Sequence, residues 1–194
     1  MILYLHGFRS SPSSFKARLV AERMQELGLG EQYICPQLPD SPGEDVRLAL
    51  ELVRRFPAES VALVGSSLGG YYATWLAEKI GCKAVLLNPV VDPLQVRPKH
   101  VDPASGIHVQ EWIRTTRQYE SEFKALRVDR ITRPERYLLL AGTADELLDW
   151  RGMTVHYAGA RQRVIEGADH GLSGFAQYMD EVLEFCGASA GAKG

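Results

Sequence analysis

The chain has 194 residues, a length that fits one domain. Hydrophobic side chains make up 45% of the residues and charged ones 24%, which excludes a disordered or collagen-like chain. Lys and Arg total 22 against 24 Asp and Glu, a formal net charge of -2. Without a basic excess we expect no nucleic-acid partner and no attraction to an anionic membrane, so the function should lie in a local site.

Six short apolar runs rich in Val, Ile, Leu and Tyr predict strands, with helical patterns between them. Most runs are continuously hydrophobic, which is typical of parallel strands covered on both faces. This alternation predicts a compact three-layer α/β fold with about six mostly parallel strands and helices on both faces. The runs are Ile2–Leu5, Tyr33–Cys35, Val61–Val64, Ala84–Leu87, Tyr137–Ala141 and Arg163–Ile165.

Three apolar stripes predict helices between and after these strands. Ser11 followed by Pro12 is typical of an N-cap with proline at the first helical position, so it predicts where the first helix begins. The stripe of that helix is Phe15, Leu19, Met24 and Leu27, and the stripe of the second is Val46, Ala49, Leu50 and Val53. The last helix is predicted to bury one face, formed by Leu172, Phe175, Ala176, Met179, Val182, Leu183 and Cys186.

Residues 89–134 interrupt the alternation of strands and helices. The segment is polar, contains five prolines and carries a helical pattern around Val109–Leu126. We interpret it as a short helical cap inserted into a single domain of residues 1–187. Residues 188–194 are mostly small, and we expect a flexible tail there.

The cysteines and the termini indicate the cellular compartment in which we expect the protein. Cys35, Cys82 and Cys186 are scattered and form no C-x-x-C pair, so the sequence suggests neither a zinc site nor a redox pair. Unpaired cysteines suit a reducing compartment. Residues 1–8 do not have the pattern of a signal peptide, so we expect none, and no run approaches the ~20 apolar residues of a membrane span. We therefore expect a cytoplasmic protein and leave its oligomeric state open.

Residues 65–69 read Gly-Ser-Ser-Leu-Gly, a G-x-S-x-G motif centred on Ser67. It follows an apolar run and precedes a helical pattern, the setting of a nucleophile elbow, in which a serine sits on a tight strand-to-helix turn. Side chains at Gly65 and Gly69 would collide with neighbouring elements. A phosphate-binding loop is excluded, because two tyrosines occupy the positions that need Lys and then Ser or Thr.

A serine nucleophile needs a histidine base and a carboxylate that orients it. In α/β-hydrolases the acid and then the histidine follow the serine along the chain. His170 stands in the loop between the last predicted strand and the last helix, where the base belongs. Asp145 comes first after the strand 137–141 and is the favoured acid, with Asp149 in reserve and Glu146 third.

Acyl transfer also needs backbone donors for the oxyanion. One N–H is expected from Leu68, the residue after the nucleophile. Another is expected from the loop after the first strand, at Phe8, with His6 and Gly7 shaping that loop. No metal or organic cofactor is implied by this arrangement.

With these residues assembled, the chain resembles the α/β-hydrolases, and more narrowly the compact bacterial YqiA-like esterases. The matching segments are His6–Pro12, Pro36–Pro39, Gly65–Leu76, Asn88–Pro89, Asp145–Trp150 and Arg161–Phe175. The resemblance implies a cytosolic hydrolase of short acyl esters or acyl thioesters that uses Ser67, Asp145 and His170. Two positions depart from the family pattern in ways that concern pocket shape: Ala144 replaces a usual glycine and Leu172 a usual aromatic residue.

We therefore expect a serine esterase or thioesterase whose partner is a small acyl ester or thioester. The oxyanion loop follows the first five residues, so we expect a trimmed hydrolase without the two leading strands of longer ones. A cofactor-free haloperoxidase or C–C hydrolase would share the triad, and a non-catalytic hydrolase-like binding protein would carry a damaged one. Basic side chains of the insertion could meet a phosphate-bearing leaving group, but interspersed acids favour a solvated helix face; they are Arg97, Lys99, Arg114, Arg117 and Lys124.

Overall fold

The computed structural model describes residues 1–96 and 109–188, so residues 97–108 of the expected cap, with Arg97 and Lys99, and 189–194 of the expected tail lie outside it. Six strands form one sheet in the order β2-β1-β3-β4-β5-β6, and every neighbouring pair is parallel. The strands are β1 Ile2–Leu5, β2 Tyr33–Ile34, β3 Ala62–Ser66, β4 Lys83–Leu87, β5 Tyr137–Gly142 and β6 Arg161–Ile165. All six predicted strands are confirmed, with ends shifted by two residues or fewer.

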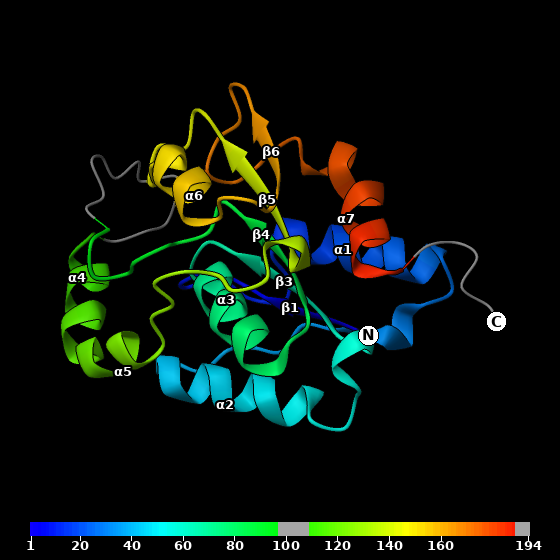
Figure 1. Cartoon of the computed structure of the whole chain (residues 1–194), viewed down its shortest axis with the longest axis horizontal. Coiled ribbons are helices and arrows are strands. Elements are labelled where there is room, and N and C mark those ends of the chain that lie inside the picture. The colour runs from blue at the N-terminus through cyan, green and yellow to red at the C-terminus, as the bar shows by residue number, and fades with distance from the viewer. Residues whose placement is uncertain (97–108, 189–194) are drawn as a thin grey trace.

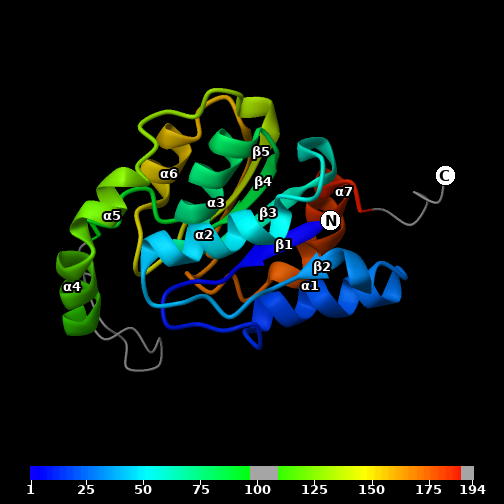
Figure 2. The same ribbon diagram turned by 90° about the horizontal axis from the view of Figure 1, so that it is seen from below.

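Helices cover both faces of the sheet, which confirms the predicted three-layer architecture (Figure 1 and Figure 2). Helices α1 and α7 pack on one face, and α2, α3 and α6 on the other. Within the described residues, no helix combines the length and the apolar character needed to cross a bilayer. The helices are α1 Phe15–Glu26, α2 Pro42–Val53, α3 Leu68–Ile80, α4 Val109–Gln118, α5 Glu120–Ala125, α6 Trp150–His156 and α7 Met179–Cys186.

Strand β1 shows why the apolar runs are continuous. Leu3 and Leu5 face α2 and α3, whereas Ile2 and Tyr4 face α1 and α7, and all four are at most 1% exposed. A strand covered on both sides has no position for a polar side chain, so the alternation of a half-exposed strand is lost.

The predicted start of the first helix is wrong. Helix α1 begins at Phe15 with Ser14 as N-cap, whereas Ser11 and Pro12 belong to a preceding turn closed by the Ser14 amide on the Ser11 carbonyl at 3.0 Å. Its buried face is formed by Ala17, Val20 and Met24, while Phe15 is 48% exposed. The second predicted stripe is confirmed, because Val46, Ala49 and Val53 are all buried in α2.

Two predicted helices are shorter than their apolar patterns. The last one is divided into a 3-10 turn over Phe175–Tyr178 and helix α7, and Ala176 is exposed. The helix cannot extend back to Leu172, whose φ of 50° lies in the left-handed region. The pattern around Val109–Leu126 is likewise divided into α4 and α5 at Tyr119.

Helices α4 and α5 lie beyond the carboxyl ends of the central strands, at the left in Figure 1 and Figure 2. Trp112 of α4 packs edge-on against Phe8, with ring centroids 5.2 Å apart. The Phe123 carbonyl of α5 accepts a hydrogen bond from the Tyr71 hydroxyl at 2.5 Å, and Glu122 accepts from the N-terminal turn of α2. This segment therefore contacts the loop after β1 and the helix after Ser67.

Candidate active site

Ser67 lies on a strained turn between β3 and α3. Its φ of 55° and ψ of -120° lie outside the regions that side chains ordinarily adopt, at a cost of roughly 1–3 kcal/mol. Three backbone hydrogen bonds hold the turn: the Ser67 amide donates to the Leu87 carbonyl at 3.0 Å, and the Ser67 carbonyl accepts from the amides of Gly70 at 2.9 Å and Val90 at 3.0 Å. The geometry is that of the nucleophile elbow predicted from the motif.

The glycines around this turn are required by close backbone approach. A Cβ at Gly69 would overlap the Leu5 carbonyl group at the end of β1, and one at Gly65 would lie 2.7 Å from the Gly70 Cα. A Cβ at Gly7 would lie 3.1 Å from the Ser67 Cβ. The loop after β1 therefore passes directly beside Ser67, as expected of a loop that supplies an oxyanion donor.

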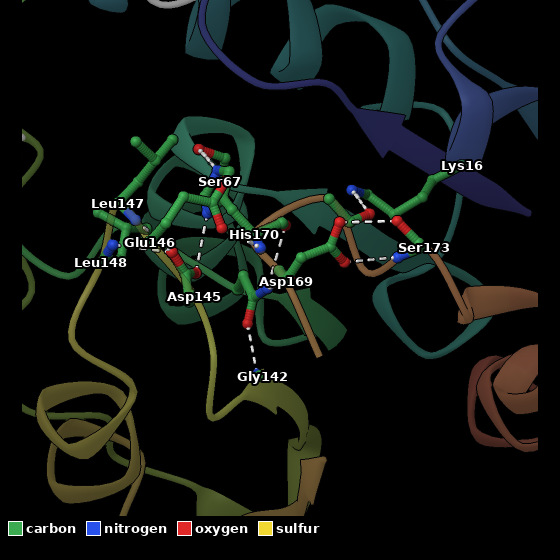
Figure 3. Close-up of polar contacts among 12 residues, drawn as sticks. Lys16, Ser67, Gly142, Asp145, Glu146, Leu147, Leu148, Asp169, His170 and Ser173 are labelled. Atoms are coloured by element: carbon green, nitrogen blue, oxygen red, sulfur yellow. Dashed lines mark hydrogen bonds and ion pairs between the residues drawn. The ribbon is translucent and has the colours of Figure 1, made fainter. Parts of the chain in front are cut away.

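Ser67, His170 and Asp145 form a chain of hydrogen bonds (Figure 3). The His170 Nε2 is 3.1 Å from the Ser67 Oγ, and its Nδ1 is 2.8 Å from the Asp145 Oδ2. The Asp145 side chain is fully buried, and its Oδ1 accepts from the amides of Leu147 and Leu148 at 2.9 and 2.8 Å. Because the carboxylate is fixed by these two donors, its other oxygen is aimed at the imidazole.

The other acidic candidates have different partners. Asp149 is the N-cap of α6 and accepts from the Arg151 amide at 3.1 Å. Glu146 accepts from the His170 backbone amide at 3.0 Å, so it holds the loop and not the imidazole. Asp169 accepts from Ser173 through both carboxylate oxygens and points away from the His170 ring.

The expected oxyanion donors lie beside Ser67. Within the part of the chain that the structure describes, the backbone amides of Phe8 and Leu68 have no hydrogen-bond acceptor, so both are available to an oxyanion. His6 is buried, its Nδ1 lies 3.0 Å from the Gly7 carbonyl, and its Nε2 accepts from the Leu38 amide at 3.2 Å. Desolvation lowers the pKa of His6, so the neutral ring links the loop after β1 to the segment after β2.

Asn88 is a positioning residue that the sequence analysis did not identify. It is fully buried at the end of β4, and its Nδ2 donates to the carbonyls of Asp169 and His170 at 2.9 and 3.0 Å. Its Oδ1 accepts from the Gly142 amide at 2.8 Å. One amide thus joins the ends of β4 and β5 to the loop that carries His170. In the sequence, Asn88 is marked by its position directly after the predicted strand 84–87, at the sheet edge that also carries Ser67.

Most of the charged residues of α4 and α5 that the structure describes pair with one another or with neighbouring segments, whereas Arg117 is exposed and forms no ion pair within the described residues. Arg114 and Lys124 pair with Glu111 and Glu120, and both are largely exposed. This arrangement is that of a solvated helix face. Among residues 1–96 and 109–188, no group of three His, Cys, Asp or Glu side chains could hold a metal ion.

Several solved structures superimpose on almost the whole of this chain. Mouse alpha/beta hydrolase domain-containing protein 10 superimposes with a TM-score of 0.68 at 17% identity, covering 94% of this chain and 89% of that one. Est1E from Butyrivibrio proteoclasticus gives 0.63 at 16% identity, covering 97% and 88%. The 2-hydroxy-6-oxo-6-phenylhexa-2,4-dienoate hydrolase of Rhodococcus sp. strain RHA1 gives 0.61 at 18% identity, covering 95% and 89%.

These likenesses show that the chain has the α/β-hydrolase fold, as the sequence predicted. The model of one family also matches almost the entire sequence, from residue 1 to residue 187. The chain therefore belongs to the uncharacterised protein family UPF0227.

Proposed function

We propose that the protein is a serine hydrolase that cleaves short acyl esters or acyl thioesters through an acyl-enzyme on Ser67. The observation that carries the proposal is the hydrogen-bond chain from the buried Asp145 through His170 to the Ser67 hydroxyl. A neutral imidazole with its proton on Nδ1 donates to Asp145, which leaves Nε2 free to accept the proton of Ser67.

The reaction has two steps. The Ser67 oxygen bonds to the carbonyl carbon while its proton passes to His170 Nε2, and the Phe8 and Leu68 amides stabilise the oxyanion. Collapse of this intermediate breaks the bond to the leaving alcohol or thiol, which takes the proton from His170. Water then attacks the acyl-enzyme with His170 again as base, releasing the acid and restoring Ser67.

We assign these roles to a single domain over residues 1–187, with residues 89–134 as a cap. Support for the cap comes from α4, whose Trp112 and Glu111 contact Phe8 and Arg9 of the loop beside Ser67. A cytoplasmic location remains our proposal, and the three free cysteines are consistent with it.

Labelling with a fluorophosphonate probe tests the nucleophile. The wild type is expected to be labelled and Ser67→Ala is not, while Ser121→Ala, an exposed serine of α5, should label like the wild type. Equal labelling of wild type and Ser67→Ala would refute the assignment. Hydrolysis of p-nitrophenyl esters of graded chain length, measured beside short acyl-CoAs, separates esterase from thioesterase activity. A labelled protein that hydrolyses neither would favour the C–C hydrolase or haloperoxidase alternative.

A further inference from the structure

A cavity of about 620 Å³ reaches Ser67 and His170 from the side of α1. Its wall combines residues that are distant in the sequence, with Tyr4 from β1, Lys16 from the first turn of α1 and Ser173 from the loop after His170. The catalytic steps proposed above use Ser67 and His170 but give no role to these three side chains. The cavity therefore has the position of a substrate subsite whose polar lining is unexplained.

Lys16 places an ammonium group in this wall. Its Nζ donates to the Gly171 carbonyl at 2.6 Å, the one acceptor within hydrogen-bond distance among the described residues (Figure 3). An ammonium carries three N–H donors, so two are available to a ligand. Arg9 also lines the cavity, but its guanidinium is paired with Glu111 of α4.

Lys16 is partly buried, and its ammonium forms no ion pair with a carboxylate among the residues that the structure describes. Burial lowers its pKa to about 8, against the opposing effects of the Asp169 and Asp145 carboxylates. Neither carboxylate forms an ion pair with Lys16. Asp169 accepts hydrogen bonds from Ser173, and Asp145 is hydrogen-bonded to His170. A partly desolvated cation without a counterion is costly to bury and would gain from an anionic ligand.

Two further features of the cavity wall favour the binding of a negatively charged group. The Tyr4 hydroxyl is buried and has no hydrogen-bond partner in the described part of the chain, and burial raises the pKa of Tyr4, so it remains a donor. The N-terminus of α1 also lines the cavity, with no acidic residue in its first turn and no side-chain cap from Ser14. Its free amides carry partial positive charge.

We propose that this cavity binds an oxyanion group of the substrate, a carboxylate or a phosphate, through the Lys16 ammonium and the Tyr4 hydroxyl. The substrates would then be acidic esters or thioesters, with the anionic group on a part of the molecule that lies beside the reacting carbonyl. This inference rests on the proposed function where it names a substrate, but the binding of the anion itself does not require turnover.

Calorimetric titration with glutarate and with inorganic phosphate tests the site without catalysis. Affinity for at least one anion is expected to fall about tenfold in Lys16→Met, to be retained largely in Lys16→Arg, and to fall to a smaller extent in Tyr4→Phe. Lys83→Met is the matched control, because Lys83 also donates to a carbonyl, that of Phe185, but lies outside the cavity. Binding to glutarate alone identifies a carboxylate site, and binding to phosphate alone a phosphate site. Absence of binding, or equal affinity in wild type and Lys16→Met, would overturn the proposal.

Turnover then tests the substrate class. The ratio of kcat/KM for monomethyl glutarate to that for methyl pentanoate is expected to fall about tenfold in Lys16→Met and to stay unchanged in Lys83→Met. If Lys16 only held the Gly171 loop, both esters would lose activity together and the ratio would not change, which would contradict the proposal. If the wild type binds glutarate but hydrolyses neither of these methyl esters, nor the p-nitrophenyl esters and acyl-CoAs named above, the proposed function fails and the anion site stands.

Discussion

Asp145 and Asp149 lie four residues apart but have different hydrogen-bond partners. We therefore expect the same substitution, aspartate to asparagine, to have different effects on kcat at the two positions. Asp145 accepts from two backbone amides with Oδ1 and faces His170 with Oδ2. An asparagine at 145 would keep its carbonyl oxygen on the two amides and turn its NH₂ toward His170 Nδ1. The imidazole would then carry its proton on Nε2 and could not accept the proton of Ser67. We expect Asp145→Asn to lower kcat for p-nitrophenyl butyrate by roughly 10³–10⁴.

Asp149→Asn is the matched control for this change. Asp149 caps α6, and asparagine is an equally good N-cap, so kcat and stability should remain within about twofold and about 0.5 kcal/mol of the wild type. An equal loss of kcat in the two variants would contradict the assignment of the acid.

The places of residues that follow from a local motif or from chain order could be predicted from the sequence. Ser67 follows from its motif, and His170 and Asp145 from their positions after predicted strands. Asn88 and Lys16 could not be predicted, because each acts on a loop far along the chain: 81 or more residues separate Asn88 from its carbonyl partners, and 155 separate Lys16 from Gly171. Such contacts carry no periodic signal.

Where helix α3 crosses the end of β1, the close approach of two backbones depends on Gly69. An added Cβ would lie 2.6 Å from the Leu5 carbonyl carbon and 2.7 Å from the His6 oxygen, and these are backbone atoms that cannot turn aside. We expect Gly69→Ala to lower the free energy of unfolding by roughly 3 kcal/mol, measured in urea. The labelling rate of Ser67 should also fall, because the loop with Phe8 must move.

Gly152 of α6 provides the comparison for this prediction. Nothing lies within 4 Å of a Cβ placed there, so Gly152→Ala should raise the free energy of unfolding by roughly 0.5–1 kcal/mol through helix propensity. If Gly69→Ala were as stable as Gly152→Ala, the close packing of α3 against β1 would be wrong.

Element boundaries were less predictable than element types. Ser11 and Pro12 carry a good N-cap signal, but turn bonds among Ser11, Ser13 and Ser14 compete for the same groups and delay the helix to Phe15. The apolar spacing around residues 172–186 fits one helix, yet the positive φ of Leu172 turns the chain before it can begin. In both places the local backbone conformation of the preceding turn sets where the helix begins, and the apolar pattern does not report it.

At the scale of the whole molecule, the parallel topology brings the residues of the candidate site together. The loops that follow β1, β3, β5 and β6 all leave the same edge of the sheet, which brings Phe8, Ser67, Asp145 and His170 together although they lie far apart in the sequence. The order of strands along the chain is enough to predict this edge. It does not predict which side chains of the covering helices enter the cavities, and substrate choice depends on those.

The same edge of the sheet carries another buried ionisable group, Asp45, in the first turn of α2. Its Oδ1 has no hydrogen-bond partner in the described part of the chain. Burial raises the pKa of Asp45 from 3.8 to about 7, with the negative charges of Asp40, Glu44 and Glu122 adding to the effect and the Tyr72 hydroxyl opposing it. Between these two pH values the folded state binds more protons than the unfolded state. The free energy of unfolding therefore falls as pH rises from about 4 to about 7.

Asp45→Asn should remove this dependence, because an amide fills the same space without a charge. We expect the variant to gain roughly 1–3 kcal/mol relative to wild type between pH 4 and pH 8, measured by urea unfolding at both pH values and at pH 6. Glu51→Gln, on the exposed side of the same helix, removes one negative charge without burial and should show little of this gain. A difference between Asp45→Asn and wild type that is the same at pH 4 and pH 8 would show that Asp45 is not held in a desolvated position.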